Sequence, residues 1–208
     1  MAISTSTDQR EARRSGEADG KRRIRADAAR NQERLLTVAA AAFAERGAEV
    51  PLEEIASGAG VGIGTLYRHF PTRDALVDAV YRHEVDVLCT RGDQLLATLP
   101  PDEALAQWMQ LFVAHMRTKR GMISVLKPMM AENPAFSSAT KGRAVDCASK
   151  LLAAGVDAGT IRSDLDGADL VRAVSGICMS TDQDQSRAGE RLIGVIVDGL
   201  RTTSTARA

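Results

Sequence analysis

The stretch from residue 62 to residue 73 combines small residues with side chains that form hydrogen bonds. The positions concerned are Gly62, Gly64, Thr65, Tyr67, Arg68, His69 and Arg73. Guanidinium, hydroxyl and imidazole groups can bond base edges, and tyrosine and arginine can also bond phosphate oxygens. Glycine lets the backbone approach such a partner closely, and a helix that starts at Gly62 would aim free N–H groups at a phosphate. These residues could therefore bind nucleic acid; the alternative is an ordinary exposed polar face.

Two short helices joined by a glycine turn are predicted to position these side chains. Proline at position 51 suits the first turn of a helix that ends in the turn 57–60. Gly60 is expected to take the left-handed backbone conformation. The second helix, over 62–70, has one buried stripe made by Ile63, Leu66 and Phe70. This is a helix-turn-helix over about residues 51–70.

Two longer helices are predicted to flank the pair. The preceding one starts near Arg25, and Gly47 is placed to stop it. Its core face contains Leu35, Leu36, Ala39, Ala42 and Phe43. The following helix has Thr72 as its N-cap and runs through Leu88.

Beyond residue 88 the sequence predicts further helices with short polar breaks. They cover residues from Pro101 through Met116, 122–130, 136–158, 169–180 and 187–201. No strand alternation competes with this pattern. We therefore expect an all-α protein of about nine helices.

The helix-turn-helix and its neighbours resemble the TetR/AcrR family of bacterial regulators. The similar residues are Ile55-Ala56, then Gly60-Val61-Gly62-Ile63-Gly64-Thr65-Leu66-Tyr67-Arg68-His69-Phe70-Pro71-Thr72-Arg73-Asp74-Ala75-Leu76, and the preceding run Ala39 to Gly47. The resemblance covers about residues 28–88. It implies a three-helix DNA-binding domain, a linking fourth helix and a C-terminal effector-binding and dimerisation domain. It also implies that Thr65, Tyr67, Arg68 and His69 lie on the recognition helix and that Arg73 holds a phosphate.

The expected domains are 25–88 for DNA binding and 89–208 for effector binding and dimerisation. Residues 1–24 contain Ser, Thr, Gly and charged residues and almost nothing to bury, which predicts a flexible basic arm. Such an arm could be a solvated tail or could touch phosphates.

Composition limits the classes of protein to which this chain can belong. The 208 residues include 27 basic and 27 acidic side chains, so a whole-chain basic surface is excluded while a local one is not. Without a long apolar run or an apolar leader segment, we expect a cytoplasmic protein with no membrane contact. Cys89, Cys147 and Cys178 are too scattered for a disulfide framework or a zinc site. None has a basic neighbour in sequence, so small core residues are favoured over redox sensors.

An enzyme is not expected, and neither is a cofactor. The glycine-rich run from Gly58 to Gly64 matches neither nucleotide-binding pattern, and it follows a helix where a strand is required. His83-Glu84 begins like a zinc protease motif, but Val87 stands where the second ligand is needed. No catalytic or metal site is predicted.

A small-molecule effector site is predicted in the C-terminal half, among residues with adaptable or aromatic side chains. The candidates are Cys89, Trp108, Phe112, His115, Met116, Met122, Met129 and Met130. The alternative for each is ordinary core packing. His115, on or beside the apolar face of its helix, could orient a polar group of a ligand.

The last two helices are expected to form a homodimer. The final helix is apolar on more than one face, which suits packing on its own domain and on a partner; the alternative is a fully buried helix of a monomer. The resulting hypothesis is a dimeric repressor that binds palindromic double-stranded operator DNA and is released by an effector. A second hypothesis is an architectural or ligand-sequestering protein whose helix-turn-helix no longer recognises sequence.

Overall fold

Helices form wherever the sequence has apolar residues at helical spacing between glycine, proline or capping residues. The computed structural model describes residues 5–180 and 186–202, and within them it has nine α-helices. The four N-terminal helices are α1 (Thr5–Arg46), α2 (Leu52–Gly58), α3 (Ile63–His69) and α4 (Arg73–Thr98). The others are α5 (Pro101–Gly121), α6 (Ile123–Glu132), α7 (Pro134–Asp157), α8 (Gly167–Ser180) and α9 (Ser186–Leu200).

The boundaries of these helices follow local chemistry. Gly47, Gly60 and Gly159 have positive φ angles of 83°, 67° and 71°, so each turns the chain where a side chain would be strained. The Thr72 side chain accepts a hydrogen bond of 3.1 Å from the backbone N–H of Ala75, which caps α4. The predicted helix stop at Gly47, the predicted left-handed conformation of Gly60 and the predicted N-cap at Thr72 are confirmed.

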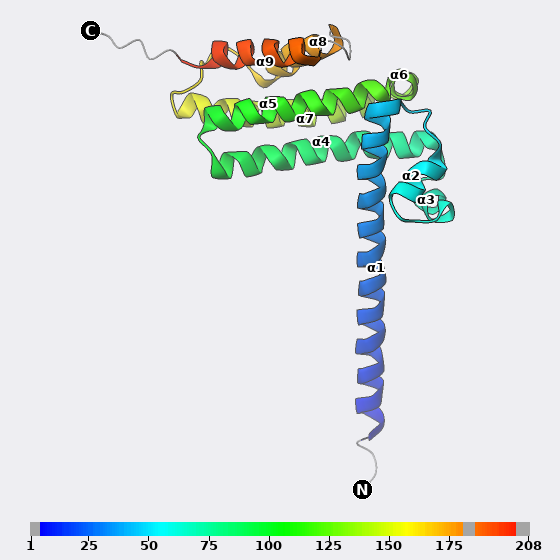
Figure 1. Ribbon diagram of the computed structural model, residues 1–208. Helices are drawn as coiled ribbons and strands as arrows, with labels where there is room; N and C mark the ends of the chain where they lie inside the picture. The colour runs from blue at the N-terminus through cyan, green and yellow to red at the C-terminus, as the bar shows by residue number, and fades with distance from the viewer. Residues whose placement is uncertain (1–4, 181–185, 203–208) are drawn as a thin grey trace, which may run out of the picture.

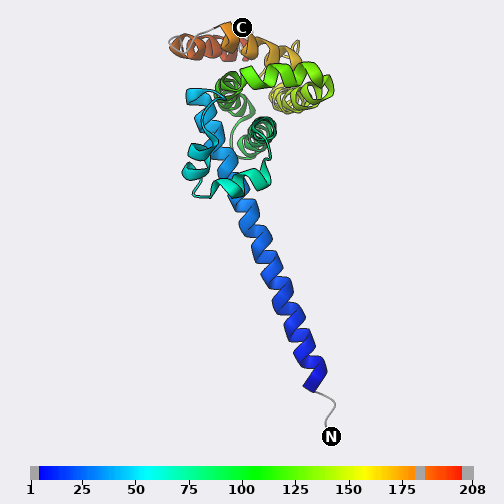
Figure 2. The same ribbon diagram turned by 90° about the vertical axis from the view of Figure 1, so that its right-hand side faces the viewer.

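The start of α1 differs from the prediction. The sequence predicted a flexible arm over residues 1–24 and a helix from Arg25, whereas the helix begins at Thr5. Residues 1–4 lie outside the described part of the chain. The segment has no proline, and its Glu, Ala, Gln, Arg and Lys residues are good helix formers. Figure 1 shows this part of α1 projecting from the molecule, and Figure 2 shows the same projection from the side.

Two hydrophobic cores lie side by side and share one helix. The first core joins α1, α2, α3, the beginning of α4 and α6, and it includes Phe43 and Leu66. The second joins the rest of α4 with α5, α7, α8 and α9 around Trp108. Along α4, Tyr81 belongs to the first core and Val85 to the second, so the changeover lies within one unbroken helix.

The C-terminal helices form three layers. Figure 1 shows α4 on one side, α5 and α7 in the middle and α8 with α9 on the other side, and Figure 2 agrees. An isolated antiparallel bridge between Ile161 and Arg201 closes the end of α9 on the loop after α7. Within it, the N–H of Arg162 donates to the oxygen of Leu200 at 2.9 Å and that of Thr202 to Thr160 at 3.0 Å. No described helix combines the length and apolar character needed to cross a bilayer.

The two domains touch a second time where the ends of α1 and α5 meet. The N–H of Ala48 donates to the oxygen of Gly121 at 2.8 Å. A Cβ at position 121 would overlap the carbonyl oxygen of Phe43. Only glycine therefore allows the two backbones to approach this closely.

We expect Gly121→Ala to lower the free energy of unfolding by about 2 kcal/mol or more, because backbone atoms must move to admit a methyl group. The matched control is Gly142→Ala in α7, where a Cβ would meet nothing within 4 Å. That variant should be unchanged or more stable by up to about 1 kcal/mol. Urea unfolding followed by circular dichroism measures both. Equal stability of the two variants would contradict the close approach at Gly121.

Candidate nucleic-acid interface

The predicted recognition element is α3, which exposes one face and buries the other. Gly62 is its N-cap, with extended backbone angles. Leu66 is fully buried and Phe70 is 4% exposed, while Ile63 packs half-buried against the first core. The predicted buried stripe is confirmed, so the opposite face of α3 is free to meet a partner.

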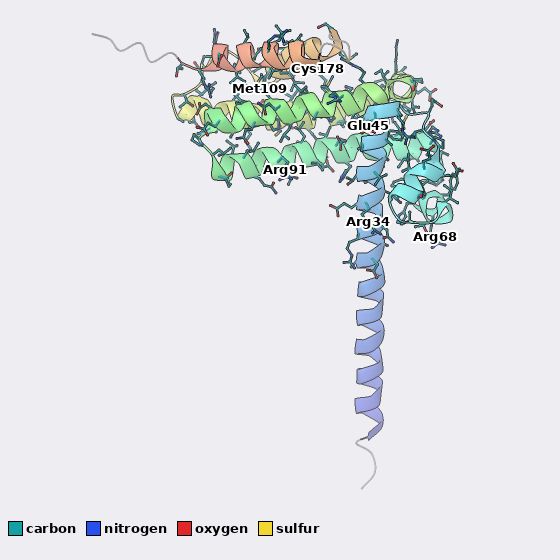
Figure 3. The ribbon with its side chains drawn as sticks, viewed as in Figure 1. Arg34, Glu45, Arg68, Arg91, Met109 and Cys178 are labelled. Atoms are coloured by element: carbon teal, nitrogen blue, oxygen red, sulfur yellow. The ribbon has the colours of Figure 1, made fainter. Side chains whose placement is uncertain are left out.

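Six of the predicted contact residues lie on or next to this free face. Gly62, Gly64, Tyr67 and Arg68 are exposed, whereas Thr65 and His69 are half-buried. The ring of His69 lies 6.1 Å from that of Phe70, which is buried. Figure 3 shows Arg68 at the outer edge of the α2–α3 unit, away from the C-terminal helices. The fold thus presents a hydroxyl, a phenol and a guanidinium on one short helix.

Arg73 has a structural task that the sequence did not indicate. Its guanidinium donates to the carbonyl oxygens of Ala48 and Val50, the latter at 2.8 Å. These bonds fasten the start of α4 to the chain between α1 and α2. A guanidinium has five N–H donors, so a phosphate contact from Arg73 remains a prediction beside this role.

An open hollow of about 880 Å³ lies between α1 and the turn of the helix-turn-helix. Its lining is Asp27, Arg30, Asn31, Glu33, Arg34, Thr37, Val38, Gly58, Ala59 and Gly60. Six of the ten lining residues are polar or charged, and none is an effector-site candidate from the sequence, so the hollow is not the effector site that the sequence predicted.

The predicted effector-site residues separate into two groups. Cys89, Trp108, Phe112, His115 and Met116 lie in or against the second core. Met122, between α5 and α6, and Met130 on α6 instead pack in the first core, and Met129 is half-buried on α6. The fold thus directs α6 toward the N-terminal helices α1 to α4, which the sequence could not show.

A polar cluster lies where the two cores meet. His115 on α5 stacks on Tyr81 of α4 with ring centroids 5.9 Å apart, and the Lys119 ammonium lies 5.4 Å from the Tyr81 ring. Burial, and to a smaller extent the charge of Lys119, lowers the pKa of His115 to about 4. Burial also raises the pKa of Tyr81 to about 12 and lowers that of Lys119. His115 is therefore neutral at physiological pH, and its buried Nδ1 has no hydrogen-bond partner.

Near this cluster, the pKa of Glu84 is also shifted. Burial raises its pKa, while the His83 charge and a hydrogen bond with Thr118 oppose that shift. Among the described residues, no group of three or more His, Cys, Asp or Glu side chains could hold a metal ion.

Family models match both parts of the chain. The model described as bacterial regulatory proteins, tetR family, matches residues 35–80, and the model of the SbtR-like transcriptional regulator C-terminal domain matches residues 100–202. A solved TetR transcriptional regulator from Streptomyces coelicolor is 40% identical, with a TM-score of 0.77 over 83% of this chain and 99% of that one. The chain belongs to the TetR family. It is a DNA-binding transcriptional regulator with an N-terminal helix-turn-helix and a C-terminal helical domain.

Other TetR-family comparisons agree. A TetR regulatory protein from Mycobacterium vanbaalenii is 38% identical, with a TM-score of 0.70 over 86% of this chain and 99% of that one. An HTH-type transcriptional regulator from Staphylococcus aureus is 36% identical over 73 residues, which is 35% of this chain. That match spans only 40% of the curated relative's length.

Alanine substitutions of the two arginines on and next to α3 should have different effects on stability and DNA binding. Arg68→Ala should leave stability unchanged, because Arg68 is exposed. It should reduce discrimination between operator and altered DNA by about 1–3 kcal/mol, because a base-edge contact is lost. Arg73→Ala should lower the free energy of unfolding by about 2 kcal/mol, since two carbonyl groups lose a charged donor, and should weaken binding to all sequences alike. Denaturant unfolding and fluorescence anisotropy separate these effects. Identical behaviour of both variants would contradict the division of roles.

The buried His115 predicts a specific pH dependence of stability. Its folded pKa lies below the unfolded value, so its contribution is complete above about pH 6.5 and is lost as pH falls toward 4. Between pH 7 and pH 5 this loss is about 2 kcal/mol. His115→Gln should unfold with a shallower pH dependence in that window, as measured by urea titrations at each pH. Equal slopes for both proteins would mean that His115 is not held neutral by burial.

Proposed function

We propose that this TetR-family regulator is a homodimeric repressor that binds a palindromic operator and is released by a small-molecule effector. The observation that supports it most directly is the continuity of α4. This helix begins beside the recognition element at Arg73 and extends into the core around Trp108. A change in the C-terminal core can therefore reposition the recognition helix.

Sequence recognition is assigned to the free face of α3. Arg68 bonds base edges in the major groove, and Thr65 and His69 add contacts within the same groove. Tyr67, which is 46% exposed, and the N–H groups after Gly62 bond phosphates. Glycine at position 64 leaves room for the helix to enter the groove.

Dimerisation is assigned to the last two helices. On α9, Ile193 and Leu200 are buried in the second core, whereas Leu192 is 44% and Val195 67% exposed. Met179 at the end of α8 is 56% exposed. A helix with one apolar face in the core and another toward solvent suits a two-fold interface. Two recognition helices about 34–36 Å apart, or a multiple, then match successive major grooves.

The effector is assigned to the interior around α5. Trp108, Phe112 and Met116 supply apolar surface on the same face of this helix as His115. The unpartnered Nδ1 of His115 can bond one polar group of a ligand, which would recover about 1–3 kcal/mol of unmet hydrogen bonding. The proposed effector is therefore mainly apolar with one hydrogen-bonding group.

Release follows from the position of α4 against α5. A ligand that binds more tightly when α5 is displaced favours that arrangement by its differential affinity alone. Because α4 packs on α5, displacement of α5 moves α4. The spacing between the two recognition helices of the dimer then changes.

Fluorescence anisotropy on the DNA that flanks the gene, against scrambled DNA at physiological salt, tests the proposal. We expect selective binding of two chains per site. Val195→Glu should produce monomers by sedimentation and lose operator binding, while Val87→Glu, at an exposed valine of α4, should keep both. A dimeric Val195→Glu protein would contradict the assigned interface. Equal weak binding to both DNAs would favour the architectural role over a sequence-specific repressor.

A further inference from the structure

Two cysteines from different helices meet where α4 packs on α7. The thiol of Cys89 donates to the backbone oxygen of Arg143, with Sγ and O 3.6 Å apart. That residue lies one helical turn before Cys147 on α7. From the other side, a Cβ on Gly92 of α4 would lie 2.8 Å from the Cys147 sulfur. The Cys147 sulfur therefore lies against the same turn of α4 that Cys89 begins.

Ion pairs on both sides hold this register. Arg143 pairs with Asp86, and Lys150 pairs with Asp93 at 2.6 Å, so pairs seven residues apart on each helix enclose the two thiols. A disulfide requires Cα atoms roughly 4.4–6.8 Å apart, and a residue without a side chain between the thiols lets two helices pack closely. Gly92 is that residue here.

The two thiols have different environments. Cys89 is half-buried, and Cys147 is 8% exposed. A hydrogen bond from Cys147 and the charge of Arg143 lower the pKa of Cys89, against opposing effects of burial, Asp86 and Asp93. The hydrogen bond with Cys89 and burial raise the pKa of Cys147. Of the two, Cys89 is therefore the thiol that loses its proton more readily.

The sequence alone favoured inert cysteines because no basic residue adjoins them along the chain. The fold brings Arg143 beside Cys89 from 54 residues away. We propose that Cys89 and Cys147 form a peroxide-responsive thiol pair that closes to an intramolecular disulfide.

The chemistry balances with hydrogen peroxide as the oxidant. The Cys89 thiolate attacks one peroxide oxygen, the O–O bond breaks, and the leaving hydroxide takes a proton to form water. The Cys147 thiol then attacks the sulfenic sulfur; the S–S bond forms, the S–O bond breaks, and the Cys147 proton leaves with hydroxide as water. Two thiols are oxidised by two electrons, and one peroxide becomes two waters.

The disulfide would tie α4 to α7. Under the proposed function, α4 must move for the recognition helices to change their spacing, so a covalent link there alters operator affinity. This consequence rests on the proposed function, whereas the thiol chemistry does not.

The first test is thiol counting on the full-length protein before and after hydrogen peroxide, with peptide mapping under non-reducing conditions. The reduced chain has three free thiols. We expect one to remain, Cys178, together with a linked peptide pair containing Cys89 and Cys147; dithiothreitol should restore all three. Retention of three thiols, or oxidation confined to sulfinic acid at Cys89, would overturn the proposal.

The matched control is Cys178→Ala, which removes a thiol that is also 8% exposed. Figure 3 shows Cys178 on α8, across the middle layer from α4. This variant should still lose two thiols, whereas Cys89→Ser should lose none to a disulfide. A linked pair that includes Cys178 would contradict the assignment.

Anisotropy on operator DNA then tests the regulatory part. Oxidation should change the wild-type affinity by about fivefold or more and leave Cys89→Ser unchanged. A disulfide that forms without changing affinity would overturn the regulatory part. If neither the reduced wild-type protein nor reduced Cys89→Ser binds operator DNA selectively, the proposed function fails instead.

Discussion

The arrangement of this protein depends on one helix that belongs to two hydrophobic cores. Because α4 is continuous through the changeover between Tyr81 and Val85, neither domain can rotate about it without bending a helix. The hydrogen bond from the N–H of Ala48 to the oxygen of Gly121 also connects the two domains. Between these connections lie the polar side chains of Tyr81, His115 and Lys119. The junction between the two cores is thus less uniformly apolar than either core. We expect the packing of the helices to rearrange more readily there than within a core.

Local signals made the recognition unit predictable from sequence. The positive-φ glycines at 47 and 60, the cap at Thr72 and the stripe that includes Leu66 all act within a turn or two of the chain. Their effects do not depend on distant packing. The helices of the C-terminal half were also foreseen, since apolar spacing and breaking residues define them locally.

What sequence could not supply is contact between distant residues. Met122 and Met130 have the composition of a ligand pocket, yet α6 packs them into the first core. Arg73 has the position of a phosphate contact, yet it also bonds the chain at 48–50. The charge beside Cys89 comes from another helix. Each outcome is set by which helix faces which, and one residue's type gives no information about that. The early start of α1 does not depend on contact between distant residues. The charged residues and glycines before Arg25 suggested a flexible arm, whereas helix propensity alone favours a helix there.

The bridge between Ile161 and Arg201 makes the residues that follow α9 an integral part of the C-terminal domain. Arg201 also donates to the Asp102 carboxylate at 3.2 Å, and the Thr202 hydroxyl donates to the oxygen of Gly159 at 2.7 Å. The last turn of α9 is therefore anchored to the start of α5 as well as to the loop after α7. Truncation just before Arg201 would remove the donors to the carbonyl oxygens of Gly159 and Thr160 and loosen α9. In an engineered version, the safer place to shorten the protein is its other end, where α1 projects away from both cores.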